Sequence, residues 1–217
     1  MKSEEIAKYL QDNPQFFEEH ADLVARIVIP HPHGGRTISI TERQMLSLRD
    51  KNKLLEAKMD ELLQFGEEND TISEKMHRLA VAMIAASSFQ SVLHTLNFHL
   101  RDDFSIPHVA LRLWDRSDNT DELPEFANVS EELQVFAETL SQPYCGSTSG
   151  FETSSWFGDA AEHIRSQALI AMRSGGGTVG MIALGSEEPQ RFYVGMGTLY
   201  LERLGEMASA ALVRVLR

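Results

Sequence analysis

The residues that could carry out chemistry in this sequence are few. Its one cysteine, Cys145, suits three roles: a nucleophile, an oxidation sensor, or a structural or pocket residue. A reactive thiol needs positively charged neighbours, because they lower its pKa. The segment 115–163 instead contains eleven acidic residues and one arginine. We therefore expect a structural or pocket cysteine with a raised pKa, and oxidation sensing is the alternative.

Histidines form a second candidate site, because His31 and His33 flank a proline and His20 lies nearby. Zinc usually requires four ligands in a fixed geometry, and no carboxylate or thiol stands at a matching spacing. We therefore expect no metal site here, and we assign these residues to a loop or docking role.

Glycines form the third pattern, since Gly175, Gly177 and Gly180 have the spacing of a dinucleotide-binding fingerprint. In that fingerprint the last glycine opens a helix whose N-terminus holds the pyrophosphate. Here a β-rich apolar run follows, so the glycines indicate a hairpin turn. No nucleophile, base and orienting group can be assembled. We expect no enzyme and no cofactor.

Composition narrows the class of protein. The chain has 217 residues, 42% of them hydrophobic, which suits one globular domain with an extension. The net charge of −12 argues against nucleic-acid binding, which depends on Lys and Arg. The longest apolar run, 79–86, is far shorter than the roughly 20 residues of a membrane span. The first residues lack the apolar core of a secretory signal, so we expect a cytoplasmic protein.

The strongest periodic signal is a heptad in a helix that starts near residue 40. Its a and d positions are Met45, Leu48, Asn52, Leu55, Met59 and Leu62. An asparagine at a seam position fixes register and favours two strands. Lys51 at g and Glu56 at the next e place opposite charges across a parallel pair. The pattern predicts a parallel coiled-coil homodimer, and the alternative is an amphipathic helix packed on its own domain.

The heptad frame weakens further along the helix. Polar or small residues occupy three seam positions, Gly66, Asn69 and Ser73. Apolar seam positions then resume at Met76, Ala80 and Met83. Because three heptads are marginal alone, we expect a longer bundle that includes helix 70–86, with the C-terminal helix as a further candidate.

The remaining elements indicate an α+β region. Alternation predicts a strand at 108–114, with Val109, Leu111 and Leu113 on one face and Ala110, Arg112 and Trp114 on the other. The other expected elements are two N-terminal helical stretches, a loop at 30–35, a helix from Phe89 to near Phe104, strands at 168–172 and 178–184, and a helix at 192–217.

Short motifs along the whole chain resemble the DUF484 family of bacterial proteins. They are Pro30-His31, Ser39–Gln44, Leu48–Asn52, Glu68–Asp70, Tyr144–Gly146, Ser166–Leu169, Gly185-Ser186, Arg191-Phe192 and Met196–Thr198. The order of elements is similar to a GAF-type sensor domain. The resemblance implies a GAF-like fold, with an antiparallel sheet flanked by helices, preceded by a helical N-terminal arm. It also implies dimerisation, but no reaction.

Known activities of GAF domains match poorly. The cyclic-nucleotide motif is absent, the bilin-type cysteine would need a following histidine where Gly146 stands, and the methionine-sulfoxide-reducing branch needs several cysteines.

We divide the chain into N-terminal helices and loop at 1–38, a coiled-coil helix at 39–86 and a GAF-like domain at 87–217. Candidate pocket residues are Arg112, Trp114, Cys145, Trp156 and Arg173.

Two functions follow from this organisation. The first is a non-catalytic homodimeric sensor that signals through a partner protein. Its acidic segment 115–163 favours a neutral or cationic ligand. A strand arginine could nevertheless bind an anionic group. The second is a ligand-free dimerisation scaffold. For the scaffold, proximity of family genes to a tyrosine recombinase suggests a link with DNA recombination. An open cavity at Arg112, Trp114 and Trp156 would favour the sensor.

Overall fold

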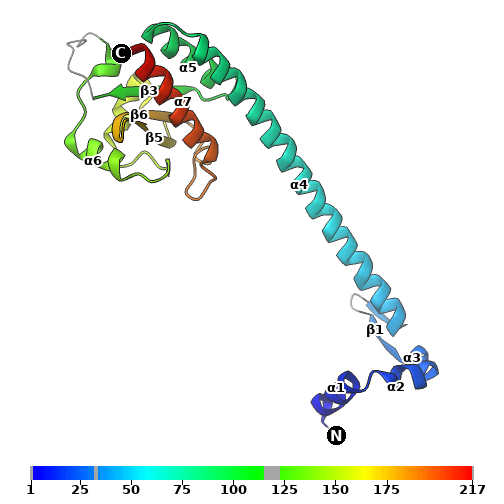
Figure 1. Ribbon diagram of the computed structural model, residues 1–217. Coiled ribbons are helices and arrows are strands. Elements are labelled where there is room, and N and C mark those ends of the chain that lie inside the picture. Colours follow the sequence, from blue (N-terminus) through cyan, green and yellow to red (C-terminus); the bar gives the residue numbers. More distant parts are fainter. Residues whose placement is uncertain (1, 32–33, 115–122, 217) are drawn as a thin grey trace. The chain divides into compact units, whose positions relative to one another are not determined.

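The computed structural model describes residues 2–31, 34–114 and 123–216 and divides the chain into two compact units, 1–68 and 69–217 (Figure 1). The helical elements of the first unit are α1 (Ser3–Asp12), α2 (Gln15–Glu19), α3 (Ala21–Arg26) and the first part of α4 (Ile40–Ala85). The backbone N–H of Lys2 donates to the Glu5 carboxylate (3.0 Å) and caps α1. The long helix begins at Ile40, as the capping pattern predicted.

A two-stranded hairpin occupies the segment that we predicted as a loop. Strand β1 (Val28–His31) pairs antiparallel with β2 (Gly34–Ser39), and the register shifts between Pro30 and His31. Proline is tolerated there because a two-stranded hairpin leaves one side of each strand without a ladder partner. The prediction of a loop over 30–35 was wrong, because Pro30 and His31 pair within β1 and Gly34 pairs within β2.

The second unit is built on one antiparallel sheet of four strands in the order β3-β6-β5-β4. Their bounds are β3 (His108–Leu113), β4 (Tyr144–Gly146), β5 (Ser166–Ser174) and β6 (Gly177–Ser186). The helical elements are α5 (Phe89–Asp102), η1 (Pro124–Phe126), α6 (Glu131–Thr139), η2 (Glu152–Ala160) and α7 (Leu199–Leu216), together with the end of α4. The predicted strands and the glycine turn at Gly175-Gly176 are confirmed.

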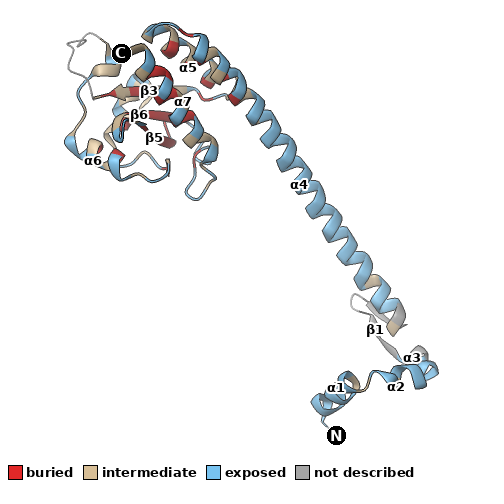
Figure 2. Cartoon of the chain, viewed as in Figure 1, coloured by how far each residue is buried: buried red, intermediate tan, exposed pale blue. Residues whose placement is uncertain are grey.

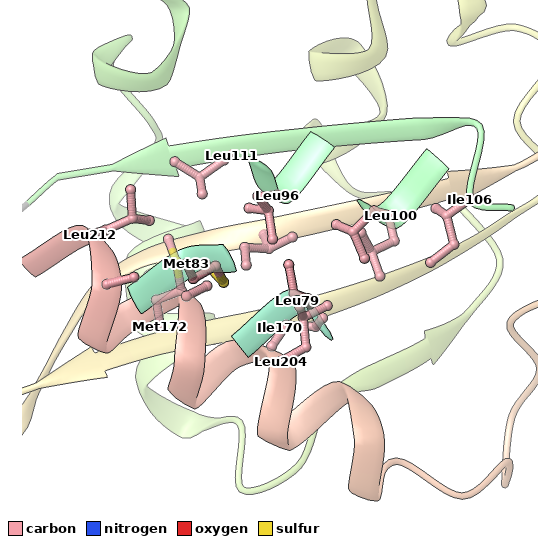
Figure 3. Close-up of a cluster of buried hydrophobic side chains, with 14 of the residues drawn as sticks. Leu79, Met83, Leu96, Leu100, Ile106, Leu111, Ile170, Met172, Leu204 and Leu212 are labelled. Atoms are coloured by element: carbon pink, nitrogen blue, oxygen red, sulfur yellow. The ribbon is translucent and has the colours of Figure 1, made fainter. Parts of the chain in front are cut away.

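The main core lies between the sheet and three helices, α4, α5 and α7 (Figure 3). Its large side chains include Leu79, Leu96, Leu100, Ile170 and Leu212, all almost fully buried. Completely burying a side chain of this size contributes about 1.5–3 kcal/mol. These contacts therefore hold the second unit together.

The end of α4 belongs to this core. Met76 and Met83, which continue the heptad frame, are 8% and 2% exposed and pack beside Leu79. Their side chains therefore pack within their own domain, whereas the apolar residues of the same frame earlier in α4 are exposed. Arg214 of α7 donates to the carbonyls of Met83, Ile84 and Ala86 at the end of α4 (3.0, 2.8 and 2.5 Å).

A smaller cluster fills the opposite face of the sheet, where α6 and η2 pack. Its buried members are Ala110, Leu133, Ala137, Leu169, Met181 and Ala183. The alternation predicted for β3 is confirmed, because Leu111 and Leu113 join the helical core whereas Ala110 and Trp114 belong to this second cluster.

The turn after α5 gives the first prediction. Ser105 has φ of 53°, a left-handed conformation that glycine adopts without steric cost, and the Ile106 N–H donates to the Leu100 carbonyl (2.8 Å). Replacing Ser105 by glycine should raise the free energy of unfolding by about 1 kcal/mol. Urea denaturation should show a higher midpoint with an unchanged slope.

Ser87→Gly is the matched control, since Ser87 is also exposed and its φ is not positive. It should lower stability slightly, because glycine there only adds freedom to the unfolded chain. Equal destabilisation by both variants would contradict the assignment of strain to Ser105.

Candidate functional site

The candidate site lies on the sheet face opposite the main core and centres on Arg112. Because side chains alternate along β3, Arg112 shares this face with His108 and Trp114. The Arg112 guanidinium lies over the Trp156 ring of η2, 4.9 Å from its centroid. Trp114 donates its indole N–H to the Thr178 carbonyl of β6 (3.0 Å), which fixes the ring at the end of the strand.

Two long-range contacts hold η2 over this face. The buried Thr153 hydroxyl donates to the Gln167 side-chain oxygen (2.9 Å), which ties η2 to β5. The Ser130 backbone N–H donates to the Glu152 carboxylate (3.2 Å), which ties η2 to the start of α6. Gly158 has φ of 57° and interrupts η2, so the chain can turn after Trp156 and Phe157.

The electrostatics of the site are those of a half-buried cation on an aromatic surface. Burial lowers the pKa of the Arg112 guanidinium, and the nearby Glu125 carboxylate acts against this shift. The group stays protonated at neutral pH, because a guanidinium does not lose its proton in proteins. One of its N–H groups donates to the Leu111 carbonyl (2.9 Å). Such a guanidinium can bind an anionic or carbonyl group by hydrogen bonds and stack planar groups on its face.

The other two predicted pocket residues lie elsewhere. Cys145 is on β4, paired with Ala168, and its side chain packs in the helical core on the other face of the sheet. Arg173 of β5 donates to the carbonyls of Ala137 (3.1 Å) and Leu140 at the end of α6. The structure thus brings together three of the predicted pocket residues, Arg112, Trp114 and Trp156. The other two, Cys145 and Arg173, are not part of that group.

Sequence reasoning missed three contributors to the site, Thr153, Gln167 and His108. Thr153 and Gln167 are both completely buried and bonded to each other, although nothing in their local sequence marks a buried pair. His108 lies at the other end of β3, and its ring meets that of Phe157 edge-on (6.3 Å between centroids). The neighbouring Trp156 and Phe157 were the available signal, because large aromatic side chains need apolar surface to pack on.

Other predicted sites fall in part outside the described residues. His33 and residues 115–122 of the acidic segment lie there, and the His31 side chain is also not described. Among the residues that the structure does describe, no three His, Cys, Asp or Glu side chains gather as metal ligands would. No described helix is long and apolar enough to cross a membrane.

The predicted dimer-interface residues lie on α4 in the first unit. The apolar seam residues are 52–68% exposed in the single chain: Met45, Leu48, Leu55, Met59 and Leu62. Lys51, Asn52 and Glu56 are exposed as well. Figure 2 shows this stretch of α4 in the colour of exposed residues.

The second unit has a GAF-like α+β fold. A free methionine-R-sulfoxide reductase from Neisseria meningitidis, solved with its substrate, matches 67% of this chain and 90% of its own, with a TM-score of 0.51 and 14% identity. The GAF domain of a putative sensor histidine kinase from Pseudomonas syringae matches 70% of this chain and 91% of its own, with a TM-score of 0.47 and 12% identity.

Sequence comparison identifies the family. Residues 1–216 match the family model described as "Protein of unknown function, DUF484", so the chain belongs to this family. The "Uncharacterized protein YigA" of Salmonella typhimurium is 27% identical over 216 residues, 96% of this chain and 90% of that protein. The protein of the same description from Escherichia coli K12 is also 27% identical over 216 residues, with the same coverage.

The environment of Cys145 gives the second prediction. Burial raises the pKa of this thiol to about 11, so the thiolate is scarce at pH 8. Alkylation by iodoacetamide at pH 8, followed by mass spectrometry, should be on the order of a hundredfold slower in the native protein than in urea. The native rate should rise as the pH approaches 11. Equal rates in native and unfolded protein would contradict a buried, unreactive thiol.

Proposed function

We propose that this protein is a non-catalytic, homodimeric GAF-like regulator in which a parallel coiled coil of α4 joins two domains. The observation that supports the dimer is the exposed apolar seam of α4, which includes Leu55 at 66% and Leu62 at 68% exposure. Burying these side chains against a second helix would stabilise the protein by about 1.5–3 kcal/mol per large side chain, and a single chain does not gain this free energy. Asn52 interrupts the seam and sets the register.

Charge supports a parallel rather than an antiparallel pair. Lys51 and Glu56 are both exposed, and their g and e positions bring opposite charges together across two parallel helices in register. Each dimer would contain two such pairs. Exposed pairs contribute little free energy, so they select the orientation more than they stabilise the dimer.

The second unit has an apolar surface of its own that suits the longer bundle. A cavity of about 380 Å³ between α4 and α7 is lined by Ala80, Met83, Ile84, Met207, Ala210, Ala211 and Arg214. Ile84 beside it is 72% exposed. In the proposed longer bundle, a second copy of this chain would cover this groove.

A regulatory role is supported by the contact between α7 and α4. The Tyr200 hydroxyl at the start of α7 donates to the Asn69 carbonyl (3.1 Å), one of the weak seam positions. A ligand that binds one arrangement of the domain better than another would shift the packing of α4 through such contacts. In this proposal a small molecule binds at the Arg112 site, and a partner protein binds the dimer and receives the signal.

The alternative function is a ligand-free scaffold, and one observation favours it. The face of the sheet beside Arg112 is filled by packed side chains, with Leu169 and Met181 completely buried. Three cavities lined by described residues lie elsewhere in the domain, and none of the three includes Arg112 or Trp156.

Disruption of the seam tests the dimer. Wild-type protein should sediment at micromolar concentration with about twice the 24.4 kDa chain mass. Leu55→Glu should raise the dissociation constant of the dimer at least tenfold. The reason is that burying two carboxylates in an apolar seam costs more than about 1.4 kcal/mol. Leu54→Glu is the matched control, since Leu54 is 63% exposed but lies outside the seam. A monomeric wild type, or equal behaviour of both variants, would refute the coiled coil.

Native mass spectrometry separates the sensor from the scaffold. Protein purified from its own host should show a dimer with an added small-molecule mass, and Arg112→Met should lose that mass if the ligand lies at the proposed site. A dimer whose mass equals two bare chains would favour the scaffold.

A further inference from the structure

A cavity with both polar and apolar lining residues lies at the edge of the sheet where β4 begins, separate from the Arg112 site. Its volume is about 230 Å³, and it is lined by α7, by the loop at 140–143 and by β5. β4 pairs only with Gln167, Ala168 and Leu169, although β5 continues alongside β6 to Ser174. The cavity therefore occupies the place that a longer β4 would have filled.

The backbone around the cavity is held in place by specific contacts. The Arg173 N–H at this edge of β5 donates to the Ser209 hydroxyl oxygen (3.1 Å), and that hydroxyl donates to the Gly205 carbonyl (2.6 Å). A Cβ at Gly205 would lie 2.6 Å from the Ile170 side chain, so only glycine lets α7 approach β5 this closely. The cavity thus has a wall fixed by packing, as a binding site requires.

Opposite charges line the cavity from different elements. Glu202 and Glu206 lie one turn apart on α7, which covers the helical face of the sheet. Arg173 also lines it, and its guanidinium is fixed toward α6, on the other face, by its hydrogen bonds to the Ala137 and Leu140 carbonyls. None of the ion pairs among the described residues joins Arg173 to either glutamate.

We propose that this cavity binds a small zwitterion of the amino-acid class. The ammonium group would face Glu202 and Glu206, and the carboxylate would bind the N–H groups of Arg173 that are not donated to the Ala137 and Leu140 carbonyls. A simple amine would leave the guanidinium without an anion, and a simple acid would be repelled by the two carboxylates. This site is independent of the proposed dimer and of the Arg112 site.

Glu206 provides the sharpest test. It is exposed, so Glu206→Gln removes one charge without disturbing the fold, whereas Glu202 accepts a hydrogen bond from the Thr198 hydroxyl (2.7 Å) at the start of α7. Glu132→Gln is the matched control, because Glu132 is an exposed glutamate on α6 outside the cavity. Arg112→Met reports on the other site.

The experiment is calorimetric titration of the full chain and these variants with each common L-amino acid at millimolar concentration. For each amino acid that binds, its decarboxylated amine and its deaminated acid are titrated as well. We expect at least one amino acid to bind wild type and Glu132→Gln equally. We expect about tenfold weaker binding to Glu206→Gln and weaker binding of both half-ligands.

Three results would overturn the proposal. They are no binding of any amino acid to wild type, equal affinity of Glu206→Gln and Glu132→Gln, or loss of binding in Arg112→Met with retention in Glu206→Gln. The last result would move the ligand to the Arg112 site and leave the proposed sensor function intact. A monomeric protein that binds an amino acid in this cavity would refute the coiled coil alone.

Discussion

Pairing of β6 with both β3 and β5 is the interaction on which the rest of the second unit depends. The last seven residues of β6, Gly180–Ser186, are all buried, so this strand is covered on both faces and paired along both edges. Each side chain on the neighbouring strands is thereby assigned to one face by alternation. Leucines of β3 face the helices, and Arg112 faces η2. Gly180 shows how tight the pairing is, because a Cβ there would lie 2.4 Å from the Arg112 carbonyl.

The two faces of this sheet have different chemistry. The helical face buries long aliphatic side chains from α4, α5 and α7, which have no polar groups to satisfy. The other face combines small residues with aromatic rings, a guanidinium and the Thr153–Gln167 pair. Two polar side chains there, Thr153 and Trp114, donate to groups in segments distant in the sequence. Three of the five candidate pocket residues, Arg112, Trp114 and Trp156, lie on or over this second face.

Sequence reasoning succeeded where a feature is periodic and local. The alternation of β3, the hairpin at Gly175-Gly176 and the helix start at Ile40 each follow from short-range rules, and all are confirmed. It failed where a position depends on long-range pairing. β4 has three residues, too few to show alternation, so its sequence did not indicate which face Cys145 would occupy. The buried Thr153–Gln167 bond spans fourteen residues and leaves no local pattern.

Three arginines of this acidic chain share one structural task. Arg214, Arg191 and Arg173 donate to main-chain carbonyls at or just after the ends of α4, α5 and α6, respectively. The C-terminal end of a helix carries partial negative charge and unpaired carbonyls, so a guanidinium satisfies both at once. Each arginine comes from a segment that is distant in the sequence from the helix it caps. Each contact therefore stabilises the tertiary arrangement as well as the helix end. Arg112 differs, because its ring contact and its bond to the adjacent Leu111 carbonyl cap no helix. Because the half-buried Arg112 guanidinium caps no helix, stability explains its position less well than it explains those of the other three, and this is why we propose a binding role for it.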